Sequence, residues 1–203
     1  MSEPTLLIVA GCNGSGKSSF SKSLVSGDFV PFDYDIHFLK FYASLFDSDI
    51  REEMAHNMAF AELENQIRRA IANGDNFCYE TNFNSTPLYW PQHFKKHGYK
   101  LHLIYLCLDS IEEAKRRVAI RVQNGGHFVP DSEIKKRYFE GFANLSSHFT
   151  YFDLIDIFDS SAYSKEPRYI LSVENGTITT KSELPEYLVT LMPNIAKGIN
   201  EKK

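Results

Sequence analysis

The feature that most constrains this 203-residue chain is the stretch from Gly11 to Ser18, which has the pattern G-x-x-x-x-G-K-S. An apolar run, Thr5 to Ala10, precedes it as an expected buried strand, and Ser18 to Val25 favours a helix. A strand, a glycine-rich loop and a helix in this order form a phosphate-binding loop, where backbone N–H groups surround an anion. The predicted nucleotide-binding residues are Asn13, Gly14, Ser15, Gly16, Lys17, Ser18 and Ser19.

Two side chains of this P-loop carry the expected chemistry. Lys17 is expected to neutralise the β- and γ-phosphates, and the Ser18 hydroxyl is the expected metal ligand, holding Mg²⁺. The predicted cofactors are therefore ATP and Mg²⁺. A transporter ATPase would need an LSGGQ-type signature and a regulatory GTPase an Asn-Lys-x-Asp motif, and the sequence contains neither.

Composition sets the outer limits of the prediction. Hydrophobic residues make up 43% and charged residues 24%, which is ordinary for a globular protein, so we expect one domain over residues 1–203. The net charge of −4 argues against broad electrostatic binding of nucleic acid. No apolar run is long enough to cross a membrane, no signal peptide is visible, and the three cysteines are scattered. We expect a cytoplasmic protein without a membrane partner.

Strand and helix patterns alternate along the chain. Strands are expected at 5–10, 76–79, 101–108 and 152–158, with helices at about 38–46, 50–72, 87–96, 110–122 and 131–144. The buried face of the helix at 50–72 is expected to carry Phe60, Leu63, Ile67 and Ile71, which recur at three-to-four spacing. The alternation predicts an α/β protein: a three-layer, nucleoside-kinase-like P-loop NTPase with a mostly parallel central sheet and a helical lid.

The carboxyl-terminal region has a different pattern. Asn175-Gly176 separates 168–173 from 177–180 and predicts a hairpin, because Asn-Gly suits a tight turn. A last helix is expected over 184–192, ended by Pro193, and then a frayed polar end over 197–203. We assign no chemistry to this hairpin and helix, about 166–193.

Acidic residues are placed where an acceptor would lie. Glu80 and Thr81 end the second expected strand, and ligands gather at the carboxyl ends of parallel strands. Glu80 is expected to bind Mg²⁺ through water or to orient the acceptor. Asp33 and Asp35 supply a candidate base for the acceptor hydroxyl and a candidate helix cap. We favour Asp35 as the base, and the choice between the two stays open.

A basic helix follows the third expected strand. Arg117 and Arg121 are four residues apart and share one face, and the helix leads into Gly125-Gly126. This layout predicts a lid, about 117–137, that brings arginines onto phosphates and excludes water. Arg117 and Arg121 are therefore candidate catalytic residues, and Arg137 is a candidate substrate contact.

Three motifs together resemble the zeta-toxin family of P-loop kinases, in particular its short stand-alone members. The motifs are Gly14 to Ser18, Tyr79-Glu80-Thr81-Asn82, and Arg121-Val122-x-x-Gly125-Gly126-His127-x-Val129-Pro130. The resemblance covers about residues 6–161. It implies that Asp35 matches the family's catalytic aspartate, Glu80 its acidic substrate-site residue, and Arg117 and Arg121 its phosphate-contacting lid arginines. Phe158 to Ser161 resembles a family Asp-Asn-Ser element near the nucleotide base, although the Asn is absent here.

The same resemblance implies an activity and a partner. The best-known members phosphorylate UDP-N-acetylglucosamine on a sugar hydroxyl, so the implied function is transfer of the γ-phosphate of Mg-ATP to a hydroxyl of a small molecule such as a nucleotide sugar. An antitoxin protein is the implied partner. Two alternatives stay open at this point: a polynucleotide 5′-hydroxyl kinase, and a non-kinase nucleotide-binding switch or ATPase.

Overall fold

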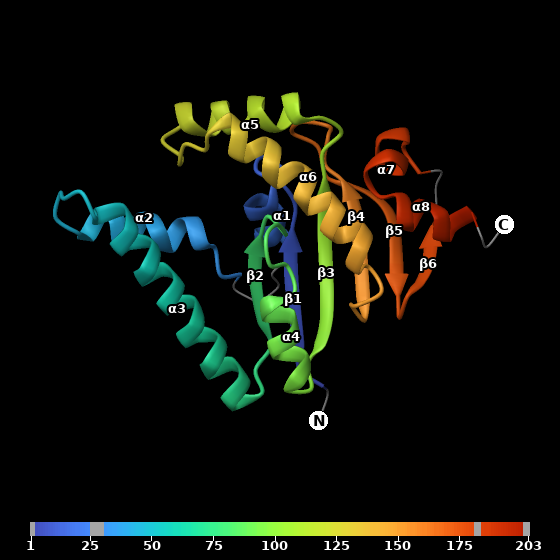
Figure 1. Ribbon diagram of the computed structural model, residues 1–203, viewed down its shortest axis with the longest axis horizontal. Helices are drawn as coiled ribbons and strands as arrows, with labels where there is room; N and C mark the ends of the chain where they lie inside the picture. Colours follow the sequence, from blue (N-terminus) through green and yellow to red (C-terminus); the bar gives the residue numbers. More distant parts are fainter. Residues whose placement is uncertain (1–2, 25–30, 181–183, 201–203) are drawn as a thin grey trace.

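A six-stranded sheet with the strand order β2-β1-β3-β4-β5-β6 forms the centre of the protein (Figure 1). The computed structural model describes residues 3–24, 31–180 and 184–200. The strands are β1 (Thr5–Ala10), β2 (Phe77–Thr81), β3 (Lys100–Cys107), β4 (Leu154–Asp159), β5 (Arg168–Glu174) and β6 (Thr177–Thr180). The first four pair in parallel, and β5 and β6 add to the β4 edge in antiparallel fashion. The predicted α/β fold with a mostly parallel sheet is confirmed.

Eight helices occur among the described residues. They are α1 (Lys17–Leu24), α2 (Tyr34–Ser44), α3 (Arg51–Asn73), α4 (Tyr89–Lys96), α5 (Ile111–Gln123), α6 (Asp131–His148), α7 (Glu186–Leu191) and α8 (Pro193–Asn200). Helices α2 and α3 form an arm that projects away from the sheet, and α5 lies beyond the arrow ends of the parallel strands (Figure 1). Within the described part of the chain, none of these helices has both the length and the apolar character needed to cross a membrane.

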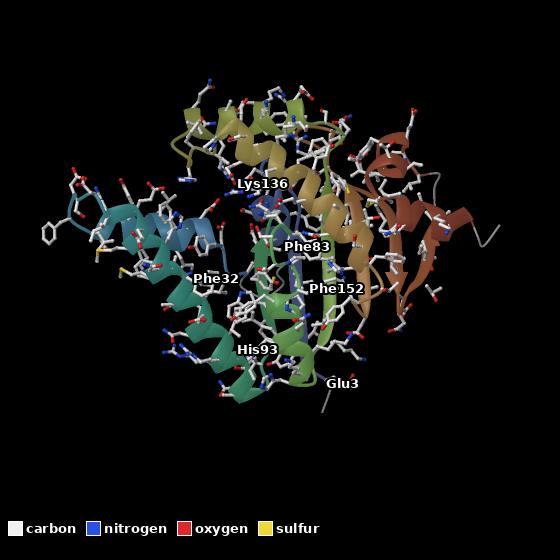
Figure 2. All side chains as sticks on the ribbon, in the orientation of Figure 1. Glu3, Phe32, Phe83, His93, Lys136 and Phe152 are labelled. Carbon is white, nitrogen blue, oxygen red and sulfur yellow. The ribbon has the colours of Figure 1, made fainter. Side chains whose placement is uncertain are left out.

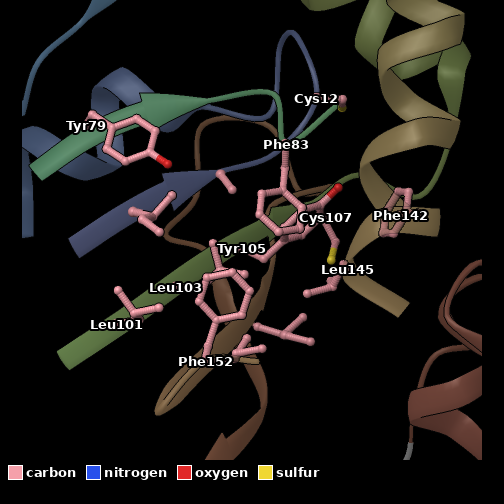
Figure 3. Packing of buried hydrophobic residues seen from close by; sticks show 14 of the residues in the cluster. Cys12, Tyr79, Phe83, Leu101, Leu103, Tyr105, Cys107, Phe142, Leu145 and Phe152 are labelled. Atoms are coloured by element: carbon pink, nitrogen blue, oxygen red, sulfur yellow. The ribbon is translucent and has the colours of Figure 1, made fainter. Parts of the chain in front are cut away.

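The sheet has a different cluster of apolar side chains on each face. Successive side chains of a strand point to opposite faces, so Ile8 of β1 and Leu103 of β3 belong to the main core, whereas Val9 and Leu106 belong to a smaller cluster. Figure 3 shows the main core, where side chains of β3 face Phe142 of α6. Helices α3, α4, α6 and α8 contribute to this core, and α1 packs Phe20 against the smaller cluster. Helical layers on both faces give the predicted three-layer arrangement.

Helix α3 turns most of the predicted face to the core, because Leu63 and Ile67 are buried and Ile71 packs against the core. Its buried residues are Ala55, Ala59, Leu63, Ile67 and Ala70. Phe60 is 44% exposed, so the expectation that it lies on the buried face is wrong. The small Ala55 and Ala59 take the buried positions because α3 packs there against Phe38 of α2, and a larger side chain would separate the two helices.

The carboxyl-terminal hairpin is confirmed, with Asn175 and Gly176 in left-handed conformations at φ 48° and 76°. The frayed end is not confirmed over Lys197 to Asn200, because α8 begins at Pro193 and continues to Asn200. A proline fits the first turn of a helix, where its missing N–H costs nothing. Helix α8 also packs on α6, where the Asn194 side chain donates to the Ser146 carbonyl at 2.9 Å. Val25 and 201–203, which belong to two predicted segments, lie outside the described residues.

Candidate active site

A cleft of about 1370 Å³ lies at the carboxyl ends of β1 and β2, with the P-loop as its floor. One wall is the α2–α3 arm, and the opposite wall is formed by α5 and α6 with the loop between them. All seven predicted nucleotide-binding residues, Asn13 to Ser19, line this cleft. So do the predicted catalytic and substrate residues Asp35, Glu80, Thr81, Arg117, Arg121 and Arg137. The fold thus brings all of the candidate residues to one place.

The Lys17 ammonium lies inside the P-loop. Its Nζ donates to the carbonyls of Gly11 (2.8 Å) and Cys12 (3.1 Å) and to Oδ1 of Asn82 at the end of β2 (3.1 Å). Burial lowers the pKa of Lys17, and the carboxylates of Glu80 and Asp35 partly oppose that effect. A phosphate group at the P-loop would supply the negative charge that this buried cation favours.

Gly14 brings the P-loop into contact with α5. Its φ is 80°, and a Cβ at this position would lie 2.9 Å from the Ala114 carbonyl oxygen and 3.1 Å from the Arg117 Cβ. Only glycine fits both the left-handed backbone and the close approach. The backbone of the P-loop at Gly14 therefore packs directly against α5, which places Arg117 beside the phosphate-binding turn.

Ser18 and Glu80 form the second part of the site. The Ser18 hydroxyl lies 2.8 Å from Glu80 Oε2 and 3.1 Å from Asp33 Oδ2, and the Ser21 hydroxyl donates to Glu80 Oε1 at 2.7 Å. Burial raises the pKa of Glu80, although the bonds from Ser21 and Ser18 favour its charged form. Hydroxyl and carboxylate oxygens are the ligands that Mg²⁺ prefers.

These oxygens fit a shared metal site better than a site made by protein alone. Across the described residues there is no group of three or more His, Cys, Asp and Glu side chains that could hold a metal ion. Mg²⁺ in nucleotide sites usually takes one or two protein ligands and completes its shell with phosphate oxygens and water. Ser18, with Glu80 and Asp33 behind it, has this composition.

A β-bridge sets the position of the two aspartates. Phe32 pairs with the edge of β2, its N–H donating to the Cys78 carbonyl at 2.9 Å and its carbonyl accepting from the Glu80 N–H at 3.1 Å. Phe32 lies between the arm and the sheet (Figure 2). This pairing holds Asp33, the next residue, beside Ser18.

Asp33 and Asp35 have different surroundings. Asp33 is the N-cap of α2, because its Oδ1 accepts from the backbone N–H of Asp35 (3.0 Å) and of Ile36 (3.3 Å). The helix therefore begins at Tyr34, earlier than the predicted start at Phe38. Asp35 is 52% exposed to the cleft, and its Oδ2 lies 3.7 Å from an Arg121 nitrogen on the opposite wall. Asp33 thus caps the helix, whereas the Asp35 carboxylate faces the cleft and Arg121.

Arg121 spans the mouth of the cleft. Besides facing Asp35, it donates from Nη2 to the His127 carbonyl at 2.9 Å, and the His127 ring meets the Phe38 ring edge-on at 5.5 Å. Its Nε is buried and has no hydrogen-bond partner among the described residues. A buried donor of this kind is costly unless a ligand pairs with it. The predicted lid at 117–137 corresponds to the second half of α5, the α5–α6 loop and the first turns of α6.

Arg117 is held more tightly than a lid residue would be. Its side chain is 11% exposed and donates to Glu113 Oε1 (2.5 Å) and to the carbonyls of Ser160 and Ser161 (both 2.8 Å). Hydrogen bonds from Arg116 and Arg117 lower the pKa of Glu113 to about 2. Arg117 therefore lies beside the P-loop with most of its donors occupied, and a direct contact with phosphate stays a prediction.

Arg137 and Thr81 lie at the cleft edge. Arg137 has an Nη1 at 3.4 Å from Asn13 Oδ1 and an Nε at 3.5 Å from Glu133. The Thr81 hydroxyl accepts from the Phe83 N–H at 3.0 Å, and the Thr81 carbonyl accepts from the Gly11 N–H at 3.3 Å. Thr81 thus helps to place the start of the P-loop, and its contact with a substrate stays a prediction.

Sequence reasoning assigned no site role to several residues of the cleft, namely Asn82, His56, Phe60 and Trp90, whereas Ser160 belongs to the element that the family resemblance placed near the nucleotide base. Asn82 could have been found, since it follows Glu80 at the carboxyl end of a strand, where ligand contacts gather. Phe60 and Trp90 carry no such signal, because they lie on helix faces that the apolar periodicity does not separate from the core. Their rings lie 6.1 Å apart at the end of the cleft formed by α3 and α4.

Comparison with known proteins gives this site a family. A sequence model of the zeta toxin family, described as "Zeta toxin", matches residues 1–164, which include every site residue discussed above. The chain belongs to the zeta toxin family. The zeta toxin match ends before β5, so the hairpin, α7 and α8 lie outside it.

Solved structures similar to this zeta toxin family member agree with the fold. The AvrRxo1-ORF1:AvrRxo1-ORF2 complex with sulphate ions has a TM-score of 0.67 and 16% identity over 88% of this chain and 61% of that one, and a structure of the same complex with ATP is also similar. A chain of the Pnkp1/Rnl/Hen1 RNA repair complex has a TM-score of 0.57 and 24% identity over 72% of this chain and 47% of that one.

The PezAT chromosomal toxin-antitoxin system of Streptococcus pneumoniae gives a TM-score of 0.58 and 16% identity, covering 99% of this chain and 88% of that one. The chain spans less than two thirds of the AvrRxo1 and RNA repair proteins. Identities this low show the shared fold alone. By family and fold, the chain is a zeta toxin family member with the fold of a P-loop NTPase.

Proposed function

We propose that this zeta toxin family member moves the γ-phosphoryl group of Mg-ATP to a hydroxyl of a small molecule, with a nucleotide sugar such as UDP-N-acetylglucosamine as the first candidate. The observation that carries the proposal is the convergence of Ser18, Glu80 and Asp35 beside the P-loop lysine in a single cleft. A triphosphate site, a metal site and a carboxylate that faces the acceptor are the parts that phosphoryl transfer to a hydroxyl needs.

The P-loop supports ATP as the phosphoryl donor. Lys17 and the loop amides supply positive charge at the floor of the cleft, and the loop between β4 and β5 lines the end of the cleft beside Arg117. A structure of the similar AvrRxo1 complex contains ATP, which supports the same nucleotide here. Mg²⁺ would be held by Ser18, with Glu80 and Asp33 behind it, and would offset negative charge on the phosphates.

The residues across the cleft support a transfer step. A bond forms between the acceptor oxygen and the γ-phosphorus, the bond from that phosphorus to the β,γ-bridging oxygen breaks, and ADP leaves. Asp35 takes the proton of the acceptor hydroxyl, since its carboxylate faces the cleft and does not cap a helix. Arg121, whose buried Nε has no partner among the described residues, would donate to the transferring group.

The acceptor side of the cleft supports a small molecule over a polynucleotide. Asp35 faces this side of the cleft, and Phe60 and Trp90 supply apolar surface. A polynucleotide carries several phosphates and is bound mainly through Lys and Arg. A molecule with a flat ring and one reacting hydroxyl matches this lining better, because aromatic side chains bind flat groups by stacking.

The test is ³¹P NMR of the purified protein with Mg-ATP and a panel of hydroxyl acceptors. The panel contains UDP-N-acetylglucosamine, simple sugars and 5′-hydroxyl oligonucleotides, and Lys17→Ala is the inactive control. A new phosphomonoester signal on a small molecule, absent with Lys17→Ala, is the expected result. A signal only on the oligonucleotide would make the protein a polynucleotide kinase. If inorganic phosphate is the only new product with every acceptor, the protein is an ATPase or a nucleotide-binding switch.

We also propose an antitoxin protein as a partner, on the likeness to the PezAT system, which is a toxin-antitoxin system. Expression of the chain in bacteria should slow growth, and Lys17→Ala should relieve this. Normal growth with active wild-type protein would count against a toxic role and thus against the need for an antitoxin.

A further inference from the structure

The loop between β4 and β5, residues 160–167, closes one end of the cleft; we call it the nucleotide-side loop. It begins inside the part of the chain that matches the zeta toxin family and ends at β5, which lies outside that part. Its position therefore depends on both β4 and the carboxyl-terminal strands and helices, to which the sequence assigned no chemistry.

The nucleotide-side loop is bonded directly to the P-loop. The Ser160 hydroxyl donates to the Ser15 carbonyl at 2.8 Å and lies 2.9 Å from the Cys107 carbonyl at the end of β3. Arg117, packed against Gly14, donates to the Ser160 and Ser161 carbonyls. A shift of this loop would therefore move groups that contact the P-loop backbone.

Aromatic and cationic side chains come together where this loop meets α5. The Tyr163 ring lies 4.7 Å from the Arg116 guanidinium carbon and 5.4 Å from that of Arg117. A guanidinium over an aromatic face is a stabilising pair. Tyr163 and Arg117 both line the cleft, so the loop presents this pair to a bound molecule.

Asp159, immediately before the nucleotide-side loop, connects it to the carboxyl-terminal region. Its side chain is 14% exposed; Oδ1 accepts from the Ser161 backbone N–H (2.9 Å) and hydroxyl (2.5 Å). Its Oδ2 accepts from an Arg168 Nη2 of β5 at 3.2 Å. The Ser161 hydroxyl in turn accepts from the Asp109 N–H at 2.9 Å, which ties the loop to the end of β3.

Tyr187 of α7 lies near the same carboxylate and belongs to a second carboxyl-terminal element. Its hydroxyl is buried near Asp159 and Ser161 without a hydrogen bond to a described residue, and this burial raises the pKa of Tyr187. Asp159 thus has Ser161 on the cleft side, and Arg168 and Tyr187 on the carboxyl-terminal side. Asp159 is the residue through which β5 and α7 contact the site.

We propose that Asp159, Arg168 and Tyr187 are positioning residues for the nucleotide, so that the carboxyl-terminal region sets nucleotide affinity through the nucleotide-side loop. The inference rests on the proposed nucleotide site and adds to it a region outside the family match. None of the three residues needs to touch the nucleotide. They hold Ser161, and with it the carbonyls to which Arg117 is bonded.

The test measures binding of Mg²⁺ and the non-hydrolysable ATP analogue AMP-PNP to the full chain by isothermal titration calorimetry. Arg168→Ala removes one exposed ion pair and should weaken binding about threefold. Asp159→Asn removes a charged acceptor from several hydrogen bonds and should weaken it about tenfold. Arg168→Lys, which keeps the charge, should recover part of the loss. The matched control is Arg69→Ala on the exposed face of α3, which should bind as wild type does.

Two further measurements separate positioning from general destabilisation. All variants are compared at a temperature where circular dichroism shows them folded, and hydrogen exchange is measured on the peptide containing residues 160–167. Faster exchange there in Arg168→Ala, with α3 peptides unchanged, is expected. The double variant Asp159→Asn with Arg168→Ala should also bind AMP-PNP no more weakly than Asp159→Asn alone.

The outcomes are distinct. This inference is overturned if AMP-PNP binds as tightly to three variants, Arg168→Ala, Asp159→Asn and Tyr187→Phe, as it does to the Arg69→Ala control. That result would leave the nucleotide site intact. No binding of AMP-PNP by the wild-type chain would overturn the proposed nucleotide site, and this inference with it. If Asp159→Asn does not fold, Arg168→Ala and Tyr187→Phe still decide the question.

Discussion

The Ser18 hydroxyl lies 2.8 Å from Glu80 Oε2, which joins the P-loop helix to the end of the neighbouring strand β2. Replacing Glu80 by Gln keeps the shape of the side chain and removes its charge. Because residues behind a metal ligand tune its affinity, the Mg²⁺ concentration needed for half-maximal phosphoryl transfer should rise about 10- to 100-fold. A Mg²⁺ titration of activity measures this, with Glu53→Gln on the exposed part of α3 as control. An unchanged Mg²⁺ requirement would remove Glu80 from the metal site.

Asp35 and Asp33 can be separated by matched substitutions. Asp35→Asn should reduce turnover about 100- to 10,000-fold, because it removes the base, while AMP-PNP affinity stays near that of wild type. Asp33→Asn should reduce turnover much less, since Asn is as good a helix cap as Asp and can still accept a hydrogen bond from Ser18. Steady-state rates and calorimetry on both variants measure this. A larger loss of turnover in Asp33→Asn would assign the base to Asp33 instead.

Gly14 and Gly74 have the same kind of backbone but different surroundings. Both have positive φ, 80° and 70°, so an alanine is strained by about 1–2 kcal/mol at either position. Only at Gly14 would the new Cβ meet other atoms, those of Ala114 and Arg117. Gly14→Ala should therefore abolish AMP-PNP binding and lower the unfolding free energy more than Gly74→Ala does. Calorimetry and urea unfolding check both, and equal losses would show that contact with α5 is unimportant.

Glu113 should make stability depend on pH. Hydrogen bonds from Arg116 and Arg117 hold its pKa at about 2, below the ordinary 4.5. The ionised group therefore stabilises the folded state above about pH 4.5, and this contribution is lost as pH falls from 4.5 towards 2. Glu113→Gln should lower the free energy of unfolding by about 1 kcal/mol at pH 7, a modest amount because Arg116, one of its two partners, is 48% exposed and its ion pair is screened by water.

Urea unfolding at pH 7 and at pH 3 measures this effect. The difference between wild type and Glu113→Gln should shrink at the lower pH. Glu112→Gln, in the same helical turn but exposed, is the control and should show little difference at either pH. A difference that grows as pH falls would contradict the assignment.

Much of this fold could be predicted because its signals are local. The P-loop pattern, the apolar strands and the Asn175-Gly176 turn each depend on a few neighbouring residues, and all are found where expected. The start of α2 was placed too late although Asp33 was a candidate cap, and the position of Asp33 beside Ser18 depends on a bridge between Phe32 and Tyr79, which are far apart in the sequence. No local pattern contains that pairing.

The site residues were predicted in part for the same reason. Lys17 lies in the P-loop that follows β1, and Glu80 lies at the end of β2. Because these strands are parallel neighbours, both residues are expected at the same edge of the sheet. Phe60 was expected in the core because its spacing places it on an apolar face of the helix. Periodicity does not show which of these apolar residues faces a cleft instead of the core. Arg117 donates hydrogen bonds to the carbonyls of Ser160 and Ser161, which lie in a loop 43 residues further along the chain. Residue spacing along one helix cannot predict such a contact.

Trp90 is the single tryptophan of the chain, and it lies in the lining of the cleft, on the side where the acceptor is proposed to bind. The intrinsic fluorescence of the whole protein excited at the indole band therefore comes from one residue at one end of one cleft. Titration with unlabelled candidate acceptors should change its intensity or emission maximum, whereas molecules that bind elsewhere should leave it unchanged. The protein thus contains its own optical probe, and large collections of compounds can be screened for the acceptor before any of them is tested as a substrate.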